Sequence, residues 1–264
     1  MNYIFELTIG EAFLAFAGLG VVFFLAGYLV IYFLGAEARR DPSSIPIAVI
    51  VSIVATAWAL SLGFAAADIW TVNADADKAT SQERSAISRL LATASPGVLD
   101  APELQKAVTL YRQAVIEDEW GRLSNVMPAA SVERALVDIR REVFRLARQD
   151  LPGALASQLV QDFDELQDAR NLRLAAGTTS VDTYKWYLVM ALTILTSIVI
   201  GLIHADREKS GRRALIVYAI TASVSLWILA IHANPYQGVG KIDSSMLYTV
   251  SRHKAPKPVE TPAP

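Results

Sequence analysis

The stretch IPIAVIVSIVATAWALSLGFAAADIW, residues 45–70, decides the fold. No charged residue interrupts it from Ile45 to Ala67, and a helix needs about 20 apolar residues to cross a bilayer. The chain then runs without proline or glycine into Asp68, Asp75 and Lys78. We therefore expect a membrane-spanning helix that continues out of the membrane.

Small or weakly polar residues recur at spacings of three and four along one face of this predicted helix. They are Ser52, Thr56, Ala59, Gly63 and Ala67, and we call this surface the small face. Such residues permit close packing of helices in a membrane. They also suit the wall of a water-filled pore in an oligomer. The second interpretation makes these five residues pore-lining.

Three further apolar runs are long enough to span a membrane: residues 12–35, residues 184 or 186 to 204, and residues 214–233. Short charged turns at residues 36–44 and 205–213 join the four runs in pairs. The sequence thus predicts an all-α integral membrane protein, with four transmembrane helices in two hairpins and a helical extramembrane domain between them. The predicted domains are 1–67, 68–185, 186–233 and a turn-rich, disordered tail at 234–264.

Helical periodicity marks the polar region between the hairpins. Three apolar stripes stand out. They consist of Leu104, Val108, Tyr111, Val115 and Leu123; of Val132, Leu136, Ile139, Val143 and Leu146; and of Leu155, Leu159, Phe163, Leu166 and Leu172. The second stripe has coiled-coil-like spacing. Its residues could be buried within the subunit or could form an oligomer interface against a neighbour.

Composition excludes several classes of function. The chain has no cysteine, so it has no disulfide, thiolate metal site or cysteine nucleophile. Its net charge of -2 argues against nucleic acid as a partner. The N-terminus has no Lys or Arg before its apolar run, which predicts a retained anchor and not a cleaved signal.

No catalytic motif, phosphate-binding loop, metal site or cofactor site is recognisable, so we predict that the protein is not an enzyme. No acidic or basic residue lies well inside a span, which disfavours a proton-coupled transporter. Acidic groups around residues 117–119 and 162–168 are interpreted as a solvated face with partners such as Arg112, Arg122 and Arg173. The alternative is a charged ring in an oligomer.

The short turns between paired spans are rich in arginine, with Arg39, Arg40, Arg207, Arg212 and Arg213. The density of basic residues predicts that these turns face the cytoplasm. The protein is thus expected in the plasma (inner) membrane, with the helical domain on the periplasmic side of a Gram-negative cell.

Four short motifs stand in this frame: Gly63-Phe64, YRQAVIEDEW at 111–120, RNLRL at 170–174 and NPYQG at 234–238. With the order of spans and domains, they resemble the bestrophin-like family of bacterial membrane proteins. The resemblance implies kinship with bestrophins, which are pentameric anion channels whose second helix lines the pore at a neck of bulky apolar residues. It also implies a cytosolic helical domain, whereas the basic residues of the short turns predict a periplasmic one.

Two functions remain open. The first is a homo-oligomeric ion channel, a pentamer by resemblance, whose partners are the lipid bilayer, further copies of the chain and small ions. The second is a non-conducting scaffold or sensor whose helical domain binds a partner protein. An axis lined by Ser52, Thr56 and Gly63 favours the channel.

Overall fold

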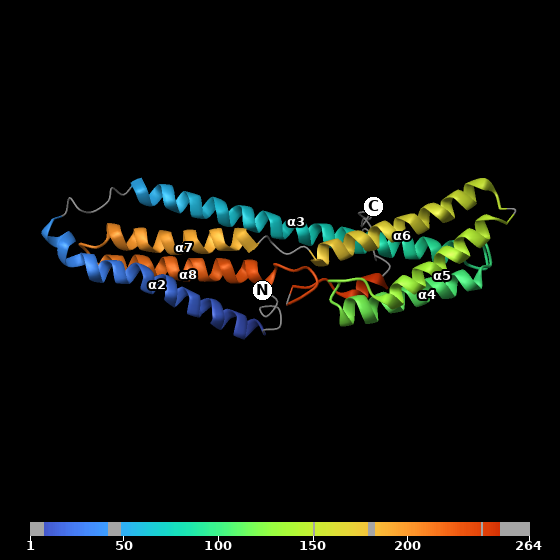
Figure 1. The fold of residues 1–264 in the computed structure, drawn as a ribbon, viewed down its shortest axis with the longest axis horizontal. Helices are drawn as coiled ribbons and strands as arrows, with labels where there is room; N and C mark the ends of the chain where they lie inside the picture. Colours follow the sequence, from blue (N-terminus) through green and yellow to red (C-terminus); the bar gives the residue numbers. More distant parts are fainter. Residues whose placement is uncertain (1–7, 42–48, 150, 179–182, 239, 249–264) are drawn as a thin grey trace, which may run out of the picture. The chain divides into compact units, whose positions relative to one another are not determined.

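The computed structural model describes residues 8–41, 49–149, 151–178, 183–238 and 240–248, and these are entirely helical or irregular (Figure 1). Two compact units are present. The membrane unit comprises residues 1–76 and 176–241, and the extramembrane unit comprises residues 77–175 and 242–264. Residues 249–264 of the predicted tail and residues 42–44 of the predicted turn lie outside the described residues.

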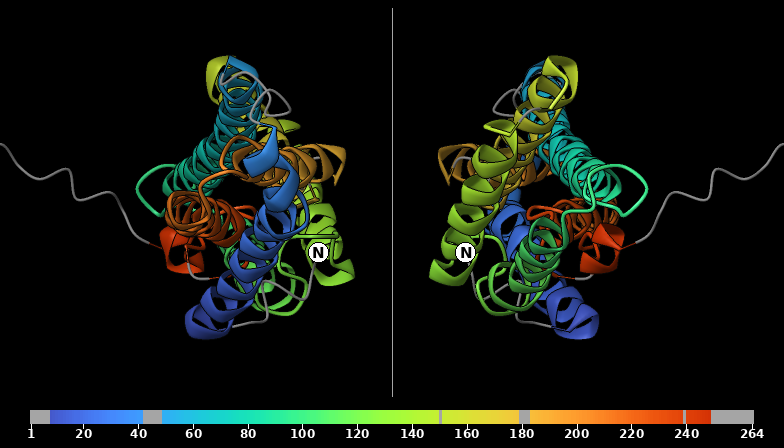
Figure 2. Two further views of the ribbon diagram at one scale, coloured as in Figure 1. Left: turned by 90° about the vertical axis from the view of Figure 1, so that its left-hand side faces the viewer. Right: turned by 90° about the vertical axis from the view of Figure 1, so that its right-hand side faces the viewer.

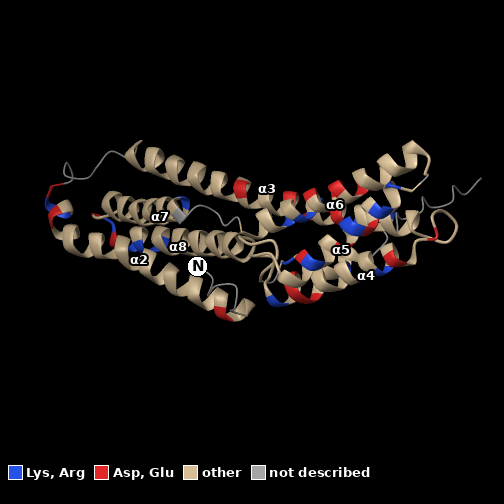
Figure 3. Cartoon of the chain, turned by 45° about the vertical axis from the view of Figure 1, so that its right-hand side comes forward, with Lys and Arg blue, Asp and Glu red and all other residues tan. Residues whose placement is uncertain are grey.

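Four helices of the structure are long and apolar enough to cross a membrane, which confirms the predicted class. They are α2 (Ile9–Arg40), α3 (Val49–Thr93), α7 (Thr183–Ile203) and α8 (Glu208–Ile231). Charged residues are sparse along α2, α7 and α8 and frequent in the second half of α3 and in the extramembrane unit (Figure 3).

The helices extend beyond the apolar runs because their ends are built from polar residues that hydropathy does not detect. Thr8 and Glu11 form a capping box at the start of α2, where the Thr8 amide donates to the Glu11 carboxylate at 2.8 Å. The same helix ends at Arg40. Its last turn contains two arginines, whose positive charges are favourable beside the partial negative charge of the helix C-terminus. Helix α3 continues unbroken for 45 residues, as its sequence predicted.

Within the membrane unit, α2 packs against both α7 and α8 (Figures 1 and 2). Glycines make this close approach possible. A Cβ atom on Gly201 of α7 would lie 3.2 Å from the Cα atom of Gly27 in α2, and closer still to its carbonyl group. This is the small-residue packing that membrane helices use in place of a hydrophobic driving force.

Polar contacts hold α3 to the other membrane helices. The Trp58 indole donates to the Thr193 hydroxyl at 2.9 Å, and its ring meets Tyr218 edge to face with centroids 5.5 Å apart. Farther along α3, the Asn73 amide donates to the carbonyl of His232 at 2.9 Å. These contacts place one face of α3 against α7 and α8 and leave the opposite face uncovered.

The extramembrane unit contains the second part of α3, α4 (Pro102–Ala114), the π-helix η2 (Val115–Arg122), α5 (Ala130–Ala147), α6 (Gly153–Thr178) and the short η3 (Ser244–Leu247). Pro96-Gly97 and Met127-Pro128 fall between helices. The π-helix was not predicted. It follows α4 directly and contains Glu119 and Trp120.

The coiled-coil-like stripe of α5 lies in the interior of the subunit. Its five side chains are at most 7% exposed; they are Val132, Leu136, Ile139, Val143 and Leu146. Helices α4 and η2 pack against α5. Burial within the subunit, the first of the two arrangements considered, accounts for the stripe. Its expected role as an oligomer interface is not supported, because covered side chains offer no area to a neighbour.

The turn-rich segment after α8 packs against the protein. The Asn234 side chain accepts from the Tyr236 amide at 2.9 Å, which forms a local turn, and the Tyr236 hydroxyl donates to the carbonyl of Ala76. In the extramembrane unit, the Trp120 indole donates to the carbonyl of Ile242, and Leu247 is buried.

Candidate functional site

The small face of α3 is uncovered by its own subunit. All five of its residues are exposed: Ser52, Thr56, Ala59, Gly63 and Ala67. A Cβ atom on Gly63 would meet nothing within 4 Å. The structure therefore brings all five predicted residues onto one open surface, and close packing within the subunit does not explain them.

Helix α3 is also the least covered of the four membrane helices. In the 18-residue apolar stretch of each helix, 11% of α3 is buried, against 28% of α2 and 33% of both α7 and α8. Beside the small face, Ile53 and Phe64 are more than half exposed. So much exposed apolar surface requires lipid or protein to cover it.

Trp70 continues the small face and was missed in the sequence. It follows Gly63 by seven residues, so it lies on the same face of the helix, and its side chain is 60% exposed. The heptad spacing from Gly63 could have revealed it, but a large aromatic residue does not fit a pattern of small ones. Near it, the exposed ion pair of Asp68 and Lys185 joins α3 to α7.

A cluster of buried charges, which we call the ion cluster, lies inside the extramembrane unit. Arg173 of α6 is fully buried. Its guanidinium donates to Glu83 of α3 at 2.5 Å and 3.2 Å, to Glu119 of η2 at 2.8 Å, and to the Asn125 side chain. Desolvation disfavours its charge, but Glu83 and Glu119 outweigh this effect and hold the pKa of Arg173 above its ordinary value.

Arg170 completes the cluster one helical turn before Arg173. Its guanidinium donates to the Glu119 carboxylate at 3.1 Å and 3.3 Å and forms an ion pair with Glu133 at 2.9 Å. Burial raises the pKa of the Glu119 carboxyl, but hydrogen bonds and charges from both arginines outweigh burial, so this pKa lies below its ordinary value. Glu119 therefore remains a carboxylate.

Two further groups donate hydrogen bonds to these carboxylates. The Tyr111 hydroxyl donates to Glu83 at 2.6 Å, and the Ala129 amide donates to Glu119 at 3.1 Å. Burial, reinforced by the charge of Glu83, raises the pKa of Tyr111 well above its ordinary value. Tyr111 is thus a neutral donor. The cluster joins α3, α4, η2 and α6 through satisfied, buried charges.

The interpretation of the acidic groups as one solvated face is wrong for Glu119 and Asp162, which are at most 1% exposed. Asp162 pairs with Arg89 at 2.6 Å. Asp118 keeps the surface role expected of it and pairs with Arg122 at 2.9 Å. No group of three or more potential metal-ligating side chains occurs among the described residues.

The positions of Arg170 and Arg173 explain why the α6 stripe was misread. The buried face of α6 runs Leu159, Phe163, Leu166, Arg170 and Arg173, at alternating spacings of four and three. Leu172, assigned to this stripe from its hydrophobicity, is 55% exposed. The spacing alone would have selected the arginines.

These features define a multi-pass, all-α membrane protein with an open apolar helix face and an extramembrane unit built around paired charges. A family model, the bestrophin-like domain, matches residues 18–247. The chain belongs to the bestrophin-like family, as its motifs suggested.

Solved structures share the fold. A single-residue variant of a bacterial bestrophin homolog from Klebsiella pneumoniae has a TM-score of 0.68 at 14% identity, covering 87% of this chain and 95% of that chain. A second variant also reaches 0.68 at 14% identity, covering 88% and 93%. Another structure of the homolog gives 0.65 at 14% identity, covering 86% and 94%. No curated protein sequence matched significantly.

Proposed function

We propose that the chain is one subunit of a homo-oligomeric ion channel in which α3 lines the pore. The observation that carries the proposal is the exposure of the entire small face on the least covered membrane helix. Several copies of α3 around an axis would cover this surface and enclose water. Membership of the bestrophin-like family supports the same arrangement, with five copies by analogy to bestrophins.

The chemistry of the small face sets the expected selectivity. Ser52 and Thr56 supply two hydroxyls per subunit, too few to replace the hydration shell of an ion as a carbonyl filter does. The proposed pore therefore passes hydrated ions with weak selectivity. Trp70 is the bulky residue of this face, and it would narrow the pore beyond the small residues.

Replacing Thr56 with leucine is expected to lower the single-channel conductance of the purified protein in planar bilayers. The larger apolar side chain narrows the path and promotes dewetting. The matched control is Ala57→Leu, because Ala57 is half-buried beside the same turn and off the small face. Both variants should assemble normally. A silent wild-type protein, or an unchanged current in Thr56→Leu, would favour the non-conducting scaffold or sensor.

We also propose that the arginine-rich turns face the cytoplasm. Exposed basic residues gather at the end of α2 and at the α7–α8 turn, whose Ala205 carbonyl lies near Gly35 of α2. The extramembrane unit would then lie in the periplasm. A reporter active only in the cytoplasm, inserted in the exposed turn at Gly97, should remain silent. An active reporter would place this unit in the cytosol, as in bestrophins.

A further inference from the structure

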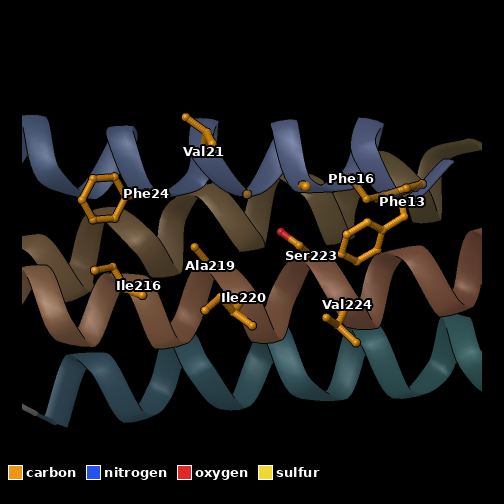
Figure 4. A pocket seen from close by; sticks show the side chains of 11 residues that line it. Phe13, Phe16, Val21, Phe24, Ile216, Ala219, Ile220, Ser223 and Val224 are labelled. Atoms are coloured by element: carbon orange, nitrogen blue, oxygen red, sulfur yellow. The ribbon is translucent and has the colours of Figure 1, made fainter. Parts of the chain in front are cut away.

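An apolar groove of about 280 Å³ runs between α2 and α8 in the membrane unit (Figure 4). Small residues, among them Ala17, Gly20 and Ala219, line it, and Phe13, Phe24, Ile216 and Ile220 are among its larger lining side chains. Ser223 supplies the hydroxyl of the groove, directed toward Gly20 in α2.

The groove opens on the outer surface of both helices. Phe13 is 47% exposed, Val21 is 57% exposed and Ile220 is 60% exposed. Phe13 meets Trp227 edge to face, with ring centroids 5.5 Å apart. The groove thus lies along two spans, with aromatic rings at both ends and no charged side chain in its lining.

The chemistry of the lining selects the occupant. An extended peptide would bring amide and carbonyl groups that this surface cannot satisfy, at a cost of several kcal/mol for each group. A second helix satisfies its own backbone but is ~10–12 Å wide, so only its side chains could enter a groove of this size. A hydrocarbon chain needs no hydrogen bonds and is narrow enough to enter.

We propose that the α2–α8 groove binds one acyl chain of a membrane lipid. The groove lies on two membrane-spanning helices, so acyl chains are the medium that surrounds it. Its volume lies just below that of ordinary ligand pockets, roughly 300–1,000 Å³, which fits part of one chain. The chain packs against Ala17 and Gly20 and keeps α2 and α8 in register along their outer surface.

The test uses the full-length protein in vesicles of phosphatidylethanolamine and phosphatidylglycerol, doped with a phosphatidylcholine that carries a diazirine on one acyl chain. After irradiation, peptide mass spectrometry locates the labelled residues. Labelling at Phe13, Val21, Ile216 and Ile220 should exceed labelling at Tyr32 and Phe33 several-fold, although the latter two are each 71% exposed.

A matched pair of variants tests the site itself. Ala17→Trp fills the groove and should reduce its labelling several-fold, while Ala15→Trp, on an exposed position outside the lining, should leave it unchanged. Equal labelling of all exposed apolar residues would overturn the proposal. So would a groove that is protected from lipid and cross-linked to a second copy. The experiment measures lipid labelling and not conductance, so a failure of the lipid-binding proposal is distinguishable from a failure of the channel proposal.

Discussion

Replacing Arg173 with methionine is expected to destabilise the extramembrane unit by about 3–5 kcal/mol, because it leaves the buried Glu83 carboxylate without its charge partner and removes one of the two arginines that pair with Glu119. Glu83 would keep only the Tyr111 hydroxyl among its described side-chain donors, and Glu119 would keep Arg170. Methionine is similar in length and apolar, so lost packing contributes little. The main effect of the substitution is therefore the loss of one positive charge from the ion cluster.

Denaturant unfolding of the detergent-solubilised protein measures this effect. Trp120 is a local reporter, since the Arg173 guanidinium lies over its ring at 5.3 Å. The matched control is Arg141→Met, because Arg141 pairs with Asp138 on the surface and is 67% exposed. Exposed pairs contribute roughly 0–1 kcal/mol. Equal stability of the two variants would show that the buried ion cluster does not stabilise this unit.

Adding Glu83→Gln to Arg173→Met should recover part of the loss. The second change removes the carboxylate that has lost its charge partner and retains a side chain that can accept from Tyr111. Buried charges cost stability mainly when they lack a partner. A double variant less stable than Arg173→Met alone would contradict this explanation.

Substituting Gly201 with alanine is expected to separate α2 from α7 and to lower the stability of the membrane unit by about 1–3 kcal/mol or more. The added methyl group meets the backbone of Gly27, and backbone cannot move aside as the end of a flexible side chain can. Nearby, the buried Ser197 hydroxyl donates to the carbonyl of Phe23, and this hydrogen bond would also be strained.

The control for this change is Gly18→Ala in α2, where a Cβ atom would meet nothing within 4 Å. Alanine favours helix by roughly 1 kcal/mol over glycine, so this variant should be at least as stable as the wild type. Thermal unfolding in detergent, with size-exclusion profiles, compares the two. If Gly201→Ala unfolds at the same temperature as Gly18→Ala, the α2–α7 contact is looser than the structure shows.

The spans could be predicted from the sequence because the energetic cost of charge in a bilayer makes hydropathy a strong signal. The ends of the spans could not, since α8 begins at Glu208 within a charged turn. Capping and interfacial residues extend helices past their apolar runs. The small face was found because its spacing of three and four is visible in one helix.

The ion cluster could not be predicted, because it depends on contacts between segments far apart in the chain. Glu119 stands in the run IEDE, which reads as a solvated surface until η2 turns it toward Arg170 and Arg173. Glu119 follows Val115 of the first apolar stripe by four residues, so the spacing placed it on the buried face, but its charge led to its assignment to the surface. The apolar stripe of α5 could be predicted from its spacing, but the helices that cover it, α4 and η2, could not.

The central claim is that several copies of α3 enclose a pore with the small face toward the axis. Single-particle imaging of the purified protein in mild detergent or in lipid nanodiscs tests it most directly. The account predicts a symmetric homo-oligomer, with five copies by analogy to bestrophins, and with Ser52, Thr56 and Gly63 facing an open axis. A monomer, or an oligomer whose axis is filled by lipid or lined by another helix, would contradict it.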